Sequence, residues 1–213
     1  MKLRPALLIA SAILLTGVLA GQAQVPGVNS SLQSVFNLVY DNSTMKPTYS
    51  SSTTTTMASS ATDVCQLRGS ATRTVKVRRI IVSAASTAVQ SDPVAIIKRS
   101  TANSGGTVVT PAVVPYDSQF SLTGAATNTG TAVAVGYIAN PTVGTAVGVL
   151  ADPYLTFSNY TTGVGGGPYP FIFGQLGSPV VLRGVAQSVA VNMSGQSIAG
   201  TTISCTFEWT EET

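Results

Sequence analysis

Residues 203–210 read ISCTFEWT, and this stretch decides the fold class. Apolar and polar side chains alternate strictly along it, which is the period of a β-strand with one buried face. The side chains expected in the core are those of Ile203, Cys205, Phe207 and Trp209. The opposite face would carry Ser204, Thr206, Glu208 and Thr210. The pattern therefore places Cys205 on the core face of the last strand.

Short segments of strand-forming sequence recur upstream. Strands are expected at 73–82, 94–97, 108–109, 113–114, 132–139, 146–150, 154–157, 171–173, 180–182 and 189–193. Turn residues separate them, as in 103–106 (NSGG) and 163–168 (GVGGGP). About ten short strands, with no helical pattern after residue 62, predict an all-β fold. We expect an antiparallel β-sandwich or jelly roll over residues 63–213, preceded by an N-terminal arm.

The first 62 residues differ from this domain in composition. Residues 1–23 combine Lys2 and Arg4 with an apolar run and then small residues, as a cleaved signal peptide does. The same stretch is long enough to remain as a membrane anchor or hydrophobic arm. Residues 24–62 are interpreted as an extended arm or linker, because 49–62 (YSSSTTTTMASSAT) is a low-complexity polar tract. Within that arm, residues 32–39 have the spacing of a short amphipathic helix, and 35–40 could equally be a strand.

Composition excludes several kinds of chemistry. Only 9% of the 213 residues are charged, the formal net charge is +3, and the chain contains no histidine. Serine and cysteine catalysis with a histidine base is therefore excluded, as are histidine metal sites. The carboxylates show no spacing that proposes a catalytic pair, and Glu211 and Glu212 are expected to be solvated. Segment 163–168 lacks the Gly-Lys-Ser/Thr of a phosphate loop. We expect a protein that is not an enzyme and has no cofactor or metal.

Charge also bears on partners. Removing residues 1–23 leaves nine basic and eight acidic residues, so strong nucleic-acid binding is not expected. Lys76 and Arg78 share the outer face of one strand. They could form a patch for an acidic partner, a glycan or nucleic acid, or supply solubilising charge at a strand edge.

The two cysteines lie near opposite ends of the predicted domain. Cys65 and Leu67 share one face of its first strand, and Cys205 is on the core face of its last. First and last strands are neighbours in many sandwiches, which would bring the cysteines side by side. A disulfide then forms in an oxidising compartment, whereas the alternative is two buried free thiols.

Aromatic residues gather around the glycine-rich segment. The aromatic residues considered for an interaction surface are Tyr154, Phe157, Tyr160, Tyr169 and Phe171. Such a region can bind sugars or form a subunit contact, and it can also be core. We expect an interaction surface here or at Lys76 and Arg78.

Five segments carry a resemblance to known proteins. They are 69–80 (GSATRTVKVRRI), 98–107 (KRSTANSGGT), 137–145 (YIANPTVGT), 181–184 (VLRG) and 208–212 (EWTEE). This sequence resembles a group of tailed-phage and bacterial proteins that look like virion-associated β-sandwiches of the capsid-decoration or head-fibre kind. The resemblance implies a structural role, no catalytic residues, and virion or cell-surface proteins as partners.

Few charges and many small residues suit a module that buries surface in an assembly. Partners would then be further copies of the chain, and homotrimers are common among jelly-roll modules. The alternative is a secreted or cell-surface module that binds a carbohydrate or surface ligand, with Tyr154, Tyr160, Tyr169 and Phe171 as contacts. Localisation would be exported or in a virion, with membrane contact only through an uncleaved 1–23 segment.

Overall fold

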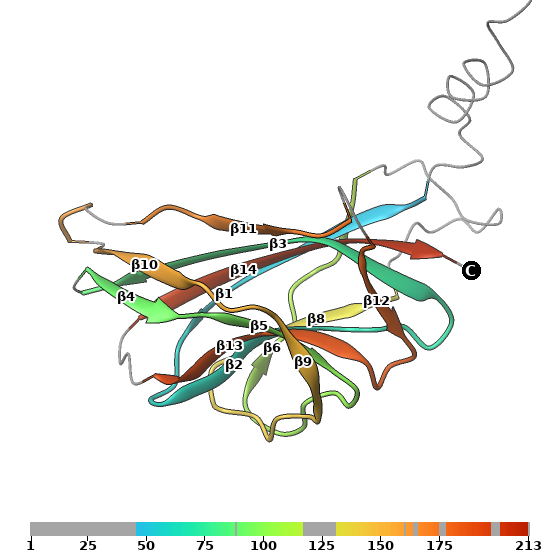
Figure 1. Cartoon of the computed structure of the whole chain (residues 1–213), viewed down its shortest axis with the longest axis horizontal. Coiled ribbons are helices and arrows are strands. Elements are labelled where there is room, and N and C mark those ends of the chain that lie inside the picture. Colours follow the sequence, from blue (N-terminus) through green and yellow to red (C-terminus); the bar gives the residue numbers. More distant parts are fainter. Residues whose placement is uncertain are drawn as a thin grey trace, which may run out of the picture. The chain divides into compact units, whose positions relative to one another are not determined.

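The computed structural model shows two β-sheets packed face to face (Figure 1). It describes residues 46–87, 89–116, 131–159, 161–163, 166–174, 178–196 and 201–212. Every regular element among these residues is a strand, which confirms the predicted β-sandwich. No helix in the described part of the chain is long and apolar enough to span a membrane. The predicted signal or anchor at 1–23, and residues 24–45 of the predicted arm, lie outside the described residues.

The larger sheet is built around β3 and β14. In spatial order it contains β4 (Gln90–Pro93), β10 (Tyr154–Asn159), β3 (Thr74–Ser86), β14 (Thr202–Glu212), β1 (Thr48–Thr56) and β7 (Val114–Pro115). Two further strands, β11 (Tyr169–Ile172) and β12 (Val180–Arg183), pair with β3. One pairing in this sheet is parallel, a two-residue contact of β10 with β3, and the rest are antiparallel.

The smaller sheet is antiparallel throughout. In spatial order it contains β6 (Val108–Val109), β8 (Val133–Tyr137), β2 (Ala61–Arg68), β13 (Ser188–Gln196), β5 (Ala95–Arg99) and β9 (Ala146–Ala151). The core between the sheets contains the inward residues of β14 as predicted, since Ile203, Cys205, Phe207 and Trp209 are all fully buried. The Trp209 ring stacks on Tyr49 with 5.9 Å between ring centroids.

The predicted linker at 49–62 is wrong, because this tract supplies β1 and the start of β2. β1 pairs with β14 over its whole length, from Thr48 opposite Thr210 to Thr56 opposite Thr202. Its inner face buries Ser51, Thr53 and Thr55 as well as Tyr49. The tract has the alternation of a strand in burial but not in polarity, since hydroxyl side chains occupy both faces. Hydrophobic periodicity therefore could not identify it.

Two of these buried hydroxyl groups are expected to lower the free energy of unfolding. Among the described residues, the Oγ1 atoms of Thr53 and Thr55 are buried and have no hydrogen-bond partner. Replacing both with valine keeps their shape and removes the unpaired polar atoms, so the free energy of unfolding should rise by about 1–3 kcal/mol per site. Urea denaturation measures this change in the free energy of unfolding. Thr54→Val is the control, because Thr54 faces outward and donates to Ser204 Oγ at 3.1 Å. A double variant no more stable than this control contradicts the expectation.

Candidate functional site

Cys65 and Cys205 form a disulfide, as predicted, but the predicted geometry is wrong. Their strands are not neighbours within one sheet: β2 lies in the smaller sheet and β14 in the larger. The bond therefore crosses the core, with the two Cα atoms 6.5 Å apart and both side chains fully buried. A buried disulfide fits an oxidising compartment, such as an exported protein meets.

The disulfide brings its two strands closer than the usual separation of packed sheets, which is about 10 Å, and small residues lie on one side of it. Gly136 lies opposite Cys65 on β8, and Thr53 lies opposite Cys205 on β1. A Cβ atom at Gly136 would lie 2.7 Å from Thr53 Oγ1, which is too close. Glycine at this position and short hydroxyl side chains on β1 thus permit the approach of the two sheets.

The crosslink should contribute strongly to stability. It joins residues 140 positions apart, and loss of a native disulfide typically costs about 2–5 kcal/mol. We expect the Cys65→Ala/Cys205→Ala variant to lose stability in that range in guanidinium denaturation. Reductant should destabilise the wild type and leave the variant unaffected. Equal stability of the two proteins in oxidising buffer would show that the bond does not form in solution.

Asp63 is the centre of a buried ion-pair network on the smaller sheet. Arg99 donates from Nε and Nη2 to its two carboxylate oxygens, each at 2.7 Å. Asn103 and Asn192 donate to the same carboxylate at 2.8 and 2.6 Å. Arg99 also donates to the carbonyl oxygen of Gly144 at 2.6 Å. These bonds hold the 100–107 and 138–145 loops against the sheet. Both oxygens of the Asp63 carboxylate accept hydrogen bonds from structural side chains.

Removing the carboxylate charge at this site should be costly. Asp63→Asn leaves the buried guanidinium of Arg99 without its counter-charge, and breaking a buried pair typically costs about 3–5 kcal/mol. Asp152→Asn makes the same change at an exposed position after β9 and should cost little. Thermal unfolding of both variants provides the comparison. Similar melting temperatures for the two would mean that the Asp63–Arg99 pair contributes nothing net.

Glu211 was expected to be solvated, and this expectation is wrong, because its side chain is fully buried. It accepts hydrogen bonds from the backbone N–H groups of Thr131 and Ala132 and from the indole of Trp209. Arg73 supplies the counter-charge at 3.4 Å. The carboxylate thus fastens the chain entering β8 to the end of β14. Its neighbour Glu212 pairs with Lys46 and Lys76 at the surface.

The predicted aromatic surface is only partly present. Phe157 and Phe171 are buried in the core, so their assignment to an interaction surface is wrong. Tyr154 and Tyr169 are exposed, at 74% and 45%, while Tyr160 lies outside the described residues. On β10, alternation explains the difference, since Tyr154 points outward and Phe157 inward. On β11, Tyr169 and Phe171 lie on the same face with their ring centroids 4.9 Å apart, and Tyr169 is the more exposed of the two. Aromatic clustering in the sequence did not distinguish the two faces.

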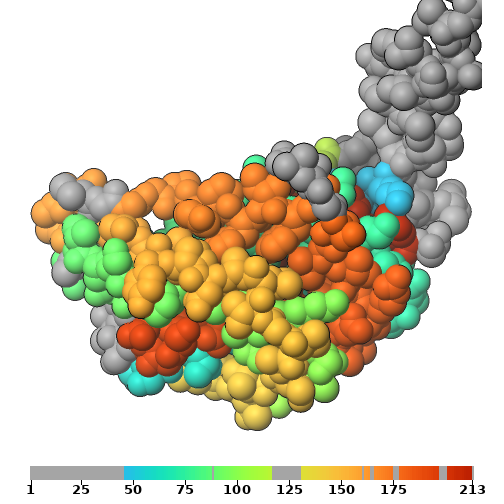
Figure 2. All heavy atoms as spheres, in the orientation of Figure 1, coloured from blue at the N-terminus to red at the C-terminus, as the bar shows by residue number. Residues whose placement is uncertain are grey.

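β9 presents an apolar surface that the sequence did not reveal. This strand lies at the edge of the smaller sheet and pairs only with β5 among the described strands. Val147, Val149 and Leu150 are 63%, 59% and 41% exposed. Figure 2 shows the segment that contains β9 and the start of β10 on the surface of the molecule. A continuous apolar run is usually buried, so the sequence predicted the strand but not its exposure.

Lys76 and Arg78 lie on the outer face of the larger sheet, and Lys76 pairs with Glu212 at 2.7 Å. Close to Arg78 is a hollow of about 230 Å³ lined by Arg78, Arg79, Ile172, Phe173, Gly174 and Glu208. Arg79 donates to both carboxylate oxygens of Glu208, at 2.9 and 2.6 Å. Partial desolvation, followed by a hydrogen bond to Glu208, raises the pKa of the half-exposed Tyr116 side chain, which is protonated at neutral pH.

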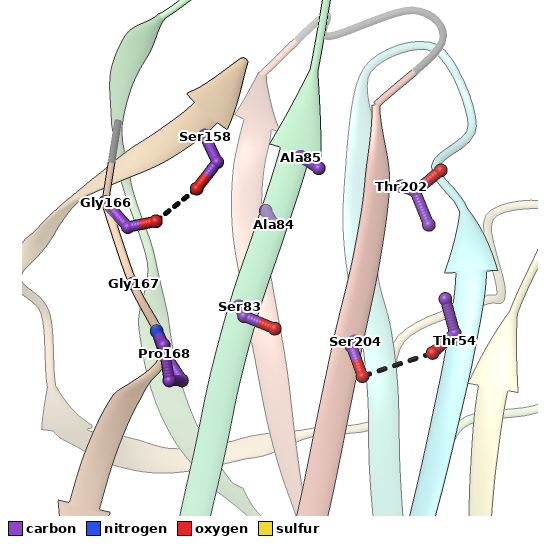
Figure 3. A pocket seen from close by; sticks show the side chains of 10 residues that line it. All are labelled: Thr54, Ser83, Ala84, Ala85, Ser158, Gly166, Gly167, Pro168, Thr202 and Ser204. Atoms are coloured by element: carbon purple, nitrogen blue, oxygen red, sulfur yellow. Dashed lines mark hydrogen bonds between the residues drawn. The ribbon is translucent and has the colours of Figure 1, made fainter. Parts of the chain in front are cut away.

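A second hollow of about 350 Å³ opens beside the other half of β3 (Figure 3). Ser83, Ala84 and Ala85 of β3 lie between its two sides. One side consists of Ser158 and the 166–168 segment, where Ser158 Oγ donates to the carbonyl oxygen of Gly166. The other consists of Thr54, Thr202 and Ser204. The lining side chains carry no charge and no aromatic ring.

In the described part of the chain, no group of three or more acidic or cysteine side chains could hold a metal ion. Comparison of the chain with models of protein families, with curated proteins and with solved structures finds no match.

Proposed function

We propose that the protein is a non-enzymatic structural module that assembles with further copies of itself through β9. The observation that supports this most is the exposure of Val147, Val149 and Leu150 on an edge strand without a charged residue. Edge strands of soluble proteins are commonly protected by charges or proline. An uncovered apolar edge of this kind favours contact with another protein surface.

The contact would be made by side chains rather than by strand addition. The pairing of β9 with β5 shifts register twice, which leaves Val147 and Leu150 as extra residues on β9. Bulges of this kind twist an edge and interrupt its backbone ladder, so continuous pairing with another strand is disfavoured. They also leave apolar side chains exposed. A second copy with the same surface is the partner, because self-complementary contacts between identical chains are the commonest in soluble oligomers.

The crosslink supports an exported location for the module. The buried disulfide supports folding outside a reducing cytosol. Residues 1–23 would direct export or stay as a hydrophobic arm, and the module would act in the periplasm, outside the cell, on its surface or in a virion. A decoration or fibre-like role agrees with the low content of charged residues and the resemblance of the sequence to virion-associated sandwiches.

A matched pair of valine substitutions tests assembly. Val149 and Val185 are each 59% exposed, but Val149 lies on β9 and Val185 in the turn after β12. We expect the full chain to form a multimer in analytical ultracentrifugation. Val149→Lys should raise the dissociation constant about tenfold or more, because burying a valine contributes about 1.5–3 kcal/mol. Val185→Lys should leave it unchanged.

Two results would overturn this proposal. One is a wild-type chain that stays monomeric at the highest soluble concentration. The other is a Val149→Lys protein that assembles as well as Val185→Lys does. Melting temperatures of both variants, measured alongside, show that the substitutions act on association and not on the fold.

A further inference from the structure

The outer face of the larger sheet has features of a binding surface that assembly through β9 does not use. We propose that this face binds a linear acidic polysaccharide, with a uronic acid carboxylate at Arg78 and neutral sugar units over the second hollow. The proposal rests on a bulge, on an excess of positive charge, and on two hollows along one strand.

The bulge places two arginines at one point of β3. Arg79 lies opposite Glu208 and Val77 lies opposite Trp209, so Arg78 is the extra residue, with no partner on β14. Arg79 uses both carboxylate oxygens of Glu208. Arg78 is exposed and has no ion-pair partner among the described residues. The guanidinium of Arg78 is therefore available for a ligand.

The first hollow fits one small acidic group. Its volume of about 230 Å³ is below the range typical of drug-sized ligands. Arg78 supplies the planar pair of N–H donors that matches a carboxylate. Ile172 and Phe173, at and just after the end of β11, add an apolar wall. Glu208 does not cancel this attraction, because Arg79 neutralises it.

The surrounding face attracts anions. Arg183 lies opposite Thr74, which places it on the same face as Lys76. Lys46 and Lys76 share a single carboxylate, that of Glu212. Among the described residues, these and the two arginines Arg78 and Arg79 make five cations on this face, against the carboxylates of Glu208 and Glu212. An excess of three positive charges on one face attracts an anionic polymer before specific contacts form.

The second hollow argues for sugar units. Its lining provides the hydroxyl groups of Thr54, Ser83, Ser158, Thr202 and Ser204, which can each donate and accept hydrogen bonds. Beyond it the hydroxyl pairs continue, as in Ser52 with Thr206 at 2.9 Å. A nucleic acid would need aromatic stacking surfaces and cations along its whole path, and this hollow is lined by neither.

The two hollows are aligned along β3. Arg78 borders one and Ala84 the other, six residues apart, which corresponds to about 20 Å of strand. That is the length of a short oligosaccharide. A chain that alternates acidic and neutral sugars could place one carboxylate at Arg78 and lie over the hydroxyl groups further along.

Calorimetric titration of the full oxidised chain tests this proposal. The probe is a hexasaccharide of alternating glucuronate and N-acetylglucosamine, with its carboxyl-reduced form as the neutral control. We expect the acidic probe to bind with an affinity that falls as salt rises, and the reduced probe to bind at least about tenfold more weakly. Val149→Lys should bind like the wild type, which separates this test from that of assembly.

Two variants locate the site. Arg78→Gln should weaken binding of the hexasaccharide about tenfold or more, whereas Lys98→Gln, which removes the same charge from the smaller sheet, should not. Ser83→Val should weaken binding of the hexasaccharide. It should not weaken binding of the corresponding disaccharide, one glucuronate joined to one N-acetylglucosamine, because that probe reaches only the Arg78 hollow. Melting temperatures confirm that each variant is folded.

Three outcomes would overturn the proposal. They are no binding of the hexasaccharide at low salt, equal loss of affinity in Arg78→Gln and Lys98→Gln, and equally tight binding of a glutamate decapeptide or a single-stranded DNA decamer. The last would show that the face selects negative charge and not a sugar chain.

Discussion

The buried crosslink between Cys65 and Cys205 is the one covalent bond between the two sheets among the described residues. It brings β2 and β14 to a Cα separation of 6.5 Å where packed sheets are ordinarily about 10 Å apart. On one side of the bond the close approach leaves room only for small residues, and Gly136 and Thr53 occupy those positions. Away from the bond, Trp209, Tyr49 and Phe157 are large buried members of the same core. The core thus combines two small residues on one side of the bond with large aromatic side chains elsewhere.

The buried charges reinforce the same arrangement from the outer layers. Asp63 holds the loops over the smaller sheet through Arg99 and Asn103, and Glu211 holds the chain entering β8 against the end of β14. Both carboxylates accept hydrogen bonds from structural partners. Chemistry at these acids would need them free, so function is better sought in the exposed features: the apolar β9 and the outer face around Arg78.

The parts of the fold that could be predicted are those where polarity follows burial. β14 alternates in both, and the strand and its core face were predicted correctly. β1 alternates in burial alone, because serine and threonine occupy both of its faces, and it was mistaken for a linker. Arg78 was assigned to the outer face, but the bulge that leaves it unpaired depends on the register with β14. Phe157 and Tyr154 have similar aromatic character, and only their positions on β10 separate core from surface.

The amino-acid sequence alone was enough to predict the fold class and most of the strands after residue 62, and its lack of histidine excludes catalysis and metal binding by that residue. These follow from composition and from local periodicity, which act between near neighbours along the chain. Tertiary structure alone decided that the disulfide joins two sheets, that Glu211 is buried, and that β9 is exposed. Each of these depends on which distant strands become neighbours, and that is settled by packing between segments far apart in the chain.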